Sequence, residues 1–431
     1  MSMNSKLNFI LVGLLFFISL VVFESHSDAQ VLPSRTIDVQ GAEILPRPCS
    51  ILNMVNEKEG ELASASLDVG DKDIVYYENR IANNGGKISV TKKRIQEPQK
   101  EIALKLLNTA TCEISIIKIT KNGADLVSPP GFDIRPVERV NGIRWNKWNT
   151  EFKIYSPANL VVIKNKYPEV VVKTTKVPGK DKQGRKITIT KKQKVQEEFM
   201  YVPYSEALHV KEFVDKGRRD LKTIVQTAYD ELRASGVRSK IFPDKNVADV
   251  EALSPKFIQR LPLLEQTDTT EFIFNSVRAF ERVEVILAAN GSLAYSKTCS
   301  KKSACGLFQF TDVFHGKKPG TYTSIARAYL DARLISGFES GAKDLVNSAK
   351  AAILLYDYNI TNLVKKYGSE VLSDPLLEEY AGAAYNGSPK WVNKSLSASI
   401  SNALDDWTGN LKSETKGYML KLRYLKENNL P

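Results

Sequence analysis

The sequence is poor in the residue types that most often hold metal ions. It contains three histidines and four cysteines in 431 residues. Beyond residue 30 only His209 and His315 remain, and neither has a second ligand at the spacing of a zinc site. A zinc site is therefore only a weak alternative to other uses of the cysteines.

Long apolar runs are absent beyond the N-terminus. Lys6 precedes an almost wholly apolar stretch at residues 7–23, and Ser27 and Ala29 place small residues at −3 and −1 of a cleavage site. This layout is typical of a secretory signal peptide, which we predict at residues 1–29. An uncleaved membrane anchor is the alternative, because the run is only just long enough to span a bilayer. No cysteine follows closely enough to suggest a lipoprotein.

Export makes disulfide bonds the favoured use of the four cysteines. Three pairings are possible, and the most economical one joins Cys49 to Cys112 and Cys299 to Cys305.

Internal repeats and low-complexity segments are also absent. The 42% hydrophobic and 26% charged residues are ordinary for a soluble globular protein, which excludes a collagen, a coiled coil or a disordered chain. The length allows two or three domains. The net charge of +12 favours binding to anionic polymers. For an exported protein, the cell wall or a membrane surface is a more plausible partner than nucleic acid. A solvated surface without a partner is the alternative.

Residues 30–204 have mostly β-like character. Strands are predicted at residues 74–77 and 112–117, which are rich in β-branched and aromatic side chains. A long hairpin is predicted at residues 160–203, and from Lys164 to Met200 it carries eleven Lys or Arg against four Asp or Glu. We predict that residues 164–200 contact anionic envelope polymers or a membrane surface. Alternatively, the lysines protect exposed strand edges from pairing. Few aromatic residues lie between the lysines of the hairpin, which argues against nucleic acid as its partner.

The remainder of the chain favours helices. Apolar residues recur at the spacing of one helix face at Leu221, Ile224, Val225, Ala228 and Leu232. Gly236 is typical of a helix end. We predict a helical linker at residues 205–260 and a mostly helical domain at 261–431. Its helices are predicted at residues 271–289, 342–358, 375–385 and 411–428. The predicted fold class is α+β, with a β-rich N-terminal region and an all-α C-terminal domain.

Three short segments of the helical region carry a resemblance to a known family. They read Gly-Leu-Phe-Gln-Phe at residues 306–310, Ala-Tyr-Asn-Gly at 384–387 and Glu-Thr-Lys-Gly-Tyr at 414–418. Together and in this order they resemble the soluble lytic murein transglycosylases, although the glycine of the second segment comes one place early. The resemblance implies a lysozyme-like domain that acts on peptidoglycan glycan strands without a metal or cofactor.

The resemblance also suggests which residues bind substrate. A polysaccharide groove needs amides that both donate and accept hydrogen bonds, and aromatic faces for the sugar rings. Gln309 and Asn386 supply amides, whereas Phe310 and Tyr385 supply rings. For Phe310, plain core packing is an equal alternative. Glu414 and Tyr418 of the third segment complete the predicted substrate-binding set.

The catalytic glutamate of the family is not where the spacing predicts it. The family has a Glu-Ser pair at the end of the helix before its Gly-Leu-Met-Gln segment, but Asn290 or Gly291 occupies that position in this sequence. An amide cannot transfer the proton that cleavage of the glycosidic bond requires. We take Glu271 and Glu265 as candidates for a replacement acid, because both precede or open the same predicted helix. Four further carboxylates are weaker candidates, namely Glu284, Glu339, Glu379 and Glu414.

These observations predict an exported protein, periplasmic or associated with the cell wall. As the resemblance implies, it would cleave the MurNAc–GlcNAc linkage and leave a 1,6-anhydro end. The alternative is a domain that has lost catalysis and binds peptidoglycan or serves as a scaffold in envelope assembly.

Overall fold

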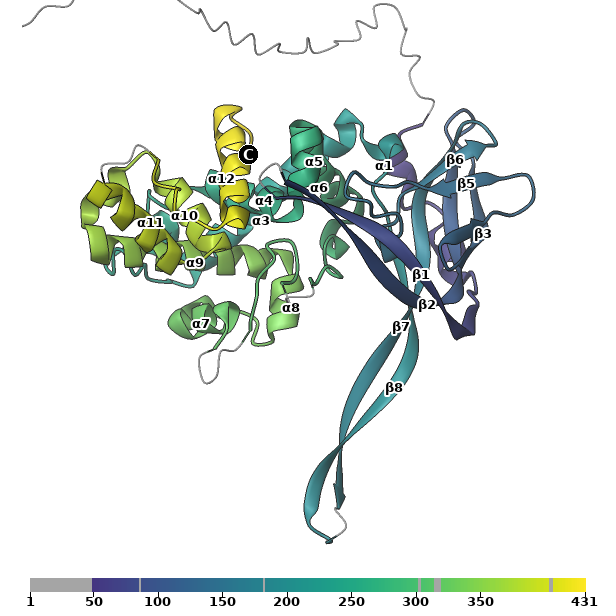
Figure 1. The fold of residues 1–431 in the computed structure, drawn as a ribbon, viewed down its shortest axis with the longest axis horizontal. Helices are drawn as coiled ribbons and strands as arrows, with labels where there is room; N and C mark the ends of the chain where they lie inside the picture. The colour runs from purple at the N-terminus through teal and green to yellow at the C-terminus, as the bar shows by residue number, and fades with distance from the viewer. Residues whose placement is uncertain (1–48, 85–86, 181–182, 301–303, 314–318, 403–405) are drawn as a thin grey trace, which may run out of the picture. The chain divides into compact units, whose positions relative to one another are not determined.

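The structure is a computed structural model that describes residues 49–84, 87–180, 183–300, 304–313, 319–402 and 406–431. A β-rich N-terminal region is followed by helices, so the mixed fold predicted from the sequence is confirmed (Figure 1). The predicted signal peptide at residues 1–29 lies outside the described residues. Within the described ranges, none of the helices combines the length and apolarity needed to cross a membrane.

An antiparallel sheet forms the centre of the β-rich region. Its strands run in the order β4-β3-β2-β7-β8, and β1 pairs with the first half of β2. The strands β5 and β6 form a separate pair. The predicted long hairpin is confirmed: β7 and β8 pair from Asn165–Tyr201 to Lys180–Lys186 and extend beyond the sheet as a two-stranded ribbon (Figure 1). The strand bounds are β1 Val69–Asn84, β2 Lys87–Asn108, β3 Ile114–Asn122, β4 Asp125–Val127, β5 Asp133–Pro136, β6 Phe152–Ser156, β7 Leu160–Lys180 and β8 Lys186–Tyr201.

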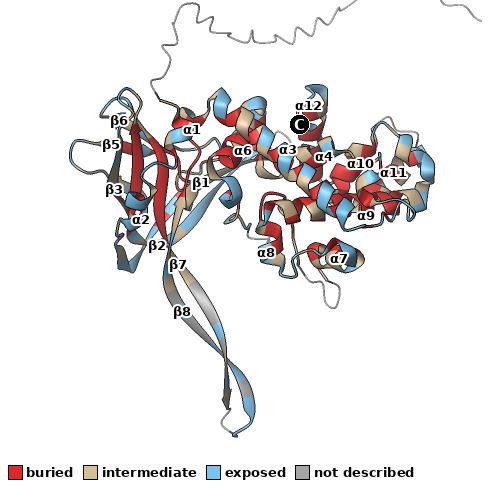
Figure 2. Ribbon diagram, turned by 180° about the vertical axis from the view of Figure 1, so that it is seen from behind, coloured by how far each residue is buried: buried red, intermediate tan, exposed pale blue. Residues whose placement is uncertain are grey.

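Alternation along β2 gives the sheet two different faces. Ile102, Leu104 and Leu106 are fully buried in a cluster with Trp145 and Phe152 from the segment around β5 and β6. Because side chains alternate along a strand, the residues between them face the other side. There the buried Lys105 donates hydrogen bonds to the backbone oxygens of two residues that follow helix α1, at 2.5 Å each. The buried strand segments of the sheet are drawn in red in Figure 2.

Two cations of the predicted contact arm are structural. Lys164 is buried and pairs with Glu59 of helix α2 at 2.8 Å. Lys166 is buried as well, and its ammonium donates to the backbone oxygens of Ala63 and Ala65 at the end of α2. The base of the hairpin therefore uses its lysines to hold α2 against the sheet, and only the part beyond Lys166 can serve as a contact arm.

The helices follow the predicted order, but two predictions had wrong boundaries. The helix predicted at residues 342–358 begins within α8 and ends before the end of α9. The single helix predicted at residues 271–289 is two helices, α5 and α6. The side chain of Asn275 accepts a hydrogen bond from the Arg278 backbone N–H and so caps the start of α6. The helix bounds are α1 Ile51–Met54, α2 Glu59–Ser64, α3 Lys211–Ala234, α4 Pro255–Gln266, α5 Thr269–Phe274, α6 Ser276–Asn290, α7 Thr321–Ala328, α8 Phe338–Lys343, α9 Leu345–Tyr367, α10 Leu377–Asn386, α11 Pro389–Asn402 and α12 Ser413–Glu427.

Helix α3, which the sequence predicts as part of a linker, packs against α6 and α9. Its buried residues Phe213, Leu221 and Val225 belong to the same apolar cluster as the helices that follow. The close approach to α6 depends on Gly217. A Cβ atom at this position would lie 2.1 Å from the backbone oxygen of Glu284.

We expect Gly217→Ala to destabilise the protein by about 2 kcal/mol or more, because α3 and α6 must separate to admit the methyl group. Urea unfolding followed by circular dichroism measures the change. Gly60→Ala is the matched control, since its Cβ would meet nothing within 4 Å. Gly60 lies within α2, so alanine there should stabilise by about 0.5–1 kcal/mol. Equal effects at the two positions would contradict the steric explanation.

Candidate functional site

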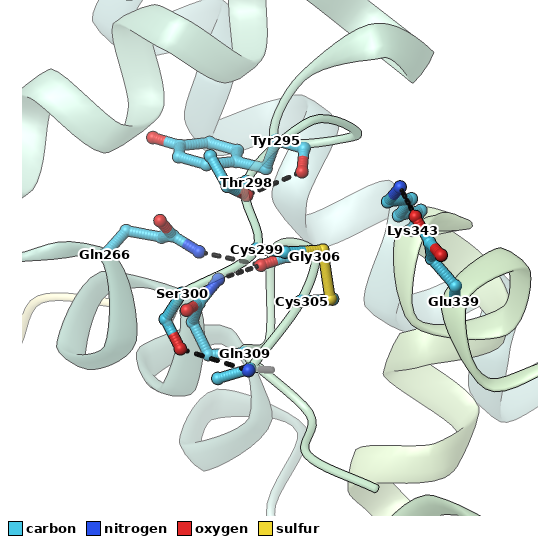
Figure 3. The surroundings of a disulfide bond; sticks show 11 residues. Gln266, Tyr295, Thr298, Cys299, Ser300, Cys305, Gly306, Gln309, Glu339 and Lys343 are labelled. Atoms are coloured by element: carbon cyan, nitrogen blue, oxygen red, sulfur yellow. Dashed lines mark hydrogen bonds and ion pairs between the residues drawn. A yellow bond between two sulfur atoms is a disulfide. The ribbon is translucent and has the colours of Figure 1, made fainter. Parts of the chain in front are cut away.

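The end of helix α4 is joined to the first of the three family-like segments. The amide nitrogen of Gln266, the last residue of α4, donates to the backbone oxygens of Gly306 and Leu307 at 2.9 Å each. Figure 3 shows this side chain directed at the Gly306 carbonyl beside the disulfide. Glu265 immediately precedes Gln266, so the same contacts hold Glu265 near the Gly-Leu-Phe-Gln segment.

The backbone of the turn at Gly306 is tightly constrained. Gly306 has a φ of +75°, and the Cys299–Cys305 disulfide, predicted from the sequence, closes the loop before it. The side chain of Gln309 folds back and donates to the Gly306 oxygen at 2.7 Å (Figure 3). The predicted amide of Gln309 therefore serves the turn rather than the hollow described next.

An open hollow of about 370 Å³ lies at the end of α4. Its lining includes Glu265, Asn386, Glu414 and Tyr418. These four candidate residues were predicted from the sequence and come from three segments that are far apart in the chain. Asn386 and the third segment are also directly linked, because the Thr415 hydroxyl donates to the Asn386 side-chain oxygen at 3.0 Å. The remaining lining residues are Leu264, Gln266, Thr267, Asp268, Thr269 and Lys421.

The carboxyl of Glu265 has a raised pKa. Burial raises the pKa of its carboxyl to about 7, and the nearby negative charge of Glu414 acts in the same direction. The positive charge of Lys421 and the hydroxyl of Tyr418 oppose this rise in pKa. A carboxyl with a pKa near 7 is protonated in about half of the molecules at neutral pH, whereas an ordinary glutamate is almost fully ionised.

The hollow continues into a second one of about 860 Å³. Asp268, Thr269 and Glu414 line both. The second hollow runs along α5 and α12 and is rich in hydroxyl groups, with Thr270, Thr408 and Ser413 among its lining residues. A polymer bound at Glu265 could therefore extend along this surface, and hydroxyl and amide groups suit a sugar chain.

Neither of the two residues predicted to supply rings, Phe310 and Tyr385, lines the hollow. Phe310 is 2% exposed and packs in the core against Tyr322 and Tyr385, so its predicted role as a sugar platform is wrong. Tyr385 is half-buried, and its hydroxyl donates to the backbone oxygen of Phe308 at 2.7 Å. Tyr385 thus joins the second family-like segment to the first.

Asn290 does not occupy the position of a catalytic acid. Its side-chain oxygen accepts from the backbone N–H of Val202, and its amide donates to the backbone oxygens of Val202 and Ile286. Asn290 therefore ties the end of α6 to the chain just after β8. In the structure α5 and α6 lie between Glu265 at the end of α4 and the Gly306 turn.

Glu271, the other predicted acid, lies outside the hollow. It pairs with Arg282 at 2.7 Å and lines a separate hollow of about 200 Å³ with Arg139, Glu151 and Tyr204. Of the four weaker candidates, Glu414 lines the hollow and the other three are engaged elsewhere. Glu284 pairs with Arg218 and Glu379 with Arg423, while Glu339 is an exposed partner of Lys343.

Sequence reasoning missed Lys421 and Asp268. Lys421 is 5% exposed, and its ammonium donates to the backbone oxygens of Leu264 and Thr267 at 2.6 and 2.7 Å. Lys421 follows Tyr418 by three positions, which places both on one face of α12. That spacing was the available signal, but a lysine on a helix is ordinarily solvated.

Neither a metal site nor the second predicted disulfide appears in the described part of the chain. No group of three or more His, Cys, Asp or Glu side chains there could hold a metal ion. His315 lies outside the described residues. The Cys49–Cys112 bond is not formed, and Cys112 is a half-buried free thiol.

Comparisons with known proteins identify no relative. No protein-family model, no curated protein and no solved structure matches the chain.

Proposed function

We propose that this protein is a peptidoglycan lytic transglycosylase whose general acid is Glu265. The observation that carries the proposal is the convergence of Glu265 with Asn386, Glu414 and Tyr418 in one hollow. These three residues come from the second and third segments that resemble the family, and the first segment accepts hydrogen bonds from Gln266, the neighbour of Glu265. The lysozyme-like character of the helical domain is part of the same proposal.

The chemistry requires one carboxyl that acts twice. Protonated Glu265 gives its proton to the glycosidic oxygen as the bond from MurNAc C1 to that oxygen breaks. As a carboxylate it then takes the proton of the MurNAc C6 hydroxyl while the C6 oxygen bonds to C1. The product is a 1,6-anhydro ring and a free GlcNAc hydroxyl, Glu265 regains its proton, and no water is consumed. A pKa of about 7 suits a group that must both donate and accept near neutral pH.

The other lining groups have roles that fit a sugar chain. The side chain of Asn386 and the hydroxyl of Thr269 supply hydrogen-bonding groups for hydroxyl and N-acetyl substituents. The larger hollow along α5 and α12 offers room for further sugars. The proposed location is the periplasm or the cell wall, which is supported by the proposed substrate and by the signal peptide predicted at residues 1–29. The hairpin beyond Lys166 is proposed to contact anionic polymers or a membrane surface.

Digestion of purified peptidoglycan with residues 30–431 tests the proposal. Mass spectrometry of the released fragments distinguishes the outcomes. Fragments with 1,6-anhydro ends support a lytic transglycosylase. Ordinary reducing ends would make the protein a hydrolase. Absence of products, with the protein still sedimenting with the sacculus, would identify a binding or scaffold protein and refute the enzymatic proposal.

The raised pKa of Glu265 predicts how cleavage depends on pH. The acid form is required for the first step, so kcat/KM should fall about tenfold per pH unit above about 7. An ordinary glutamate would lose its proton near pH 4–5, and the fall would then begin there. Initial rates on soluble glycan fragments between pH 5 and 9 measure the profile. A fall centred below pH 5.5 would contradict the assignment of a buried acid.

A further inference from the structure

Lys421 is the only basic residue that lines the Glu265 hollow within the described part of the chain. It is almost fully buried, and burial of an ammonium group is costly unless its donors are satisfied. Its nearest hydrogen-bonding partners are not carboxylates but two backbone oxygens. Lys105 and Lys166 hold helix ends by the same kind of contact, but Lys421 differs from them because it lines the hollow beside Glu265.

The two partners of Lys421 lie on either side of Glu265 in the sequence. The Leu264 oxygen precedes Glu265 by one residue, and the Thr267 oxygen follows it by two. Both belong to the C-terminal end of α4, where backbone oxygens lack helical partners and the helix dipole favours a cation. The ammonium therefore bridges the beginning and the end of the turn that carries Glu265.

We propose that Lys421 is the positioning residue of this hollow: its ammonium fixes the turn that carries Glu265 and supplies the positive charge next to that carboxyl. Lys421 makes no proposed contact with the sugar. It acts through Glu265, and the inference rests on the proposed function only for its effect on cleavage.

The charge of Lys421 has a definite direction of effect. It lowers the pKa of Glu265 against the larger upward effect of burial, so loss of the charge should raise that pKa further. Burial in turn lowers the pKa of Lys421 to about 8. The two groups should therefore influence one another's titration. The titratable groups that face this pair are Glu414 and Tyr418 on α12, Tyr385 on α10, and Asp268 and Glu271 at the start of α5.

A carboxyl-directed ¹³C NMR titration tests the proposal without relying on enzyme activity. The Glu265 resonance is assigned by its disappearance in Glu265→Gln. In Lys421→Gln we expect the Glu265 pKa to rise by about one unit or more. In Lys421→Arg it should stay within about half a unit of the wild-type value, since the charge is kept and arginine stays protonated. Lys426→Gln, on the same helix but paired with Glu379, is the control and should leave the Glu265 resonance unchanged.

An unchanged Glu265 titration in Lys421→Gln would overturn the proposal. If that variant does not fold, the wild-type protein still decides the question. Its Glu265 resonance should shift a second time as the Lys421 ammonium loses its proton, whose pKa burial lowers, and a Glu265 resonance that does not respond to this deprotonation would overturn the proposal.

Cleavage assays add a second result. If the protein cleaves peptidoglycan, the high-pH fall in kcat/KM should move upwards in Lys421→Gln together with the Glu265 pKa. A lower rate with an unmoved pH profile would show a merely structural role. If no variant and no wild-type protein cleaves, the NMR result still stands, and only the proposed function fails.

Discussion

Glu265→Gln is expected to lower peptidoglycan cleavage by at least about 10³-fold, since loss of a general acid lowers a rate by roughly 10²–10⁴-fold and the proposed mechanism uses Glu265 in both steps. The glutamine keeps the size and hydrogen-bonding ability of the side chain but cannot give up a proton to the glycosidic oxygen. The measurement is the rate of release of 1,6-anhydro fragments, quantified by mass. Because the hollow is preserved, the variant should still sediment with sacculi, which separates lost chemistry from lost binding.

Glu271→Gln is the matched control for this experiment. Glu271 lies in the adjacent helix and was an equal candidate from the sequence, but it pairs with Arg282 outside the hollow. A glutamine there can still accept a hydrogen bond from Arg282, so cleavage should stay within about tenfold of wild type. Loss of cleavage in Glu271→Gln with retention in Glu265→Gln would show that the acid has been assigned to the wrong residue.

Gly306→Ala is expected to cause the largest loss of stability of any single methyl addition discussed, at least about 3 kcal/mol. A Cβ at Gly306 would lie 1.7 Å from the backbone oxygen of Ala342, so the α8 backbone or the turn must move. The φ of +75° adds the strain of a side chain in the left-handed region, about 1 kcal/mol. Because the Gln266 side chain donates a hydrogen bond to the Gly306 oxygen, movement of the turn should also displace the neighbouring Glu265.

Gly131→Ala separates the two contributions. Gly131 has a φ of +85° but open space around its missing side chain, so alanine should cost only about 1 kcal/mol there. Chemical unfolding of both variants gives the difference, and peptidoglycan cleavage by the folded fraction gives the effect on the site. Equal losses of stability at the two positions would show that the contact with Ala342 is relieved without cost.

The sequence predicted the parts of the site that are defined by short local patterns. Asn386, Glu414 and Tyr418 were recognised because each belongs to a segment with a fixed order of residues, and all three line one hollow. Asn290, which the spacing places at the position of the family's glutamate, is hydrogen-bonded to Val202 and Ile286, and counting along the chain could not show these contacts. Counting could not show the contact from Gln266 to Gly306 either, because it spans forty residues.

Burial and capping account for the remaining differences. From the sequence, Phe310 was equally well explained as a groove residue or as a core residue. Its packing against Tyr322 and Tyr385 shows that it is a core residue. The helix predicted at residues 271–289 shows an unbroken apolar pattern, but Asn275 satisfies the backbone N–H of Arg278 and starts a new helix. No sequence pattern could predict the role of Lys421, because its partners are backbone oxygens more than 150 residues away in the chain.

The position of α12 in the chain has a consequence for biosynthesis. Glu414, Tyr418 and Lys421 all belong to this last described helix, whereas Glu265 lies far upstream. A chain is made from its N-terminus, at about 5–20 residues per second. A nascent protein that already contains Glu265 therefore lacks one wall of its hollow until the α12 segment has left the ribosome. Completion of the hollow therefore comes after the synthesis of Glu265, and a chain that stops between Glu265 and α12 should lack the wall formed by Glu414, Tyr418 and Lys421.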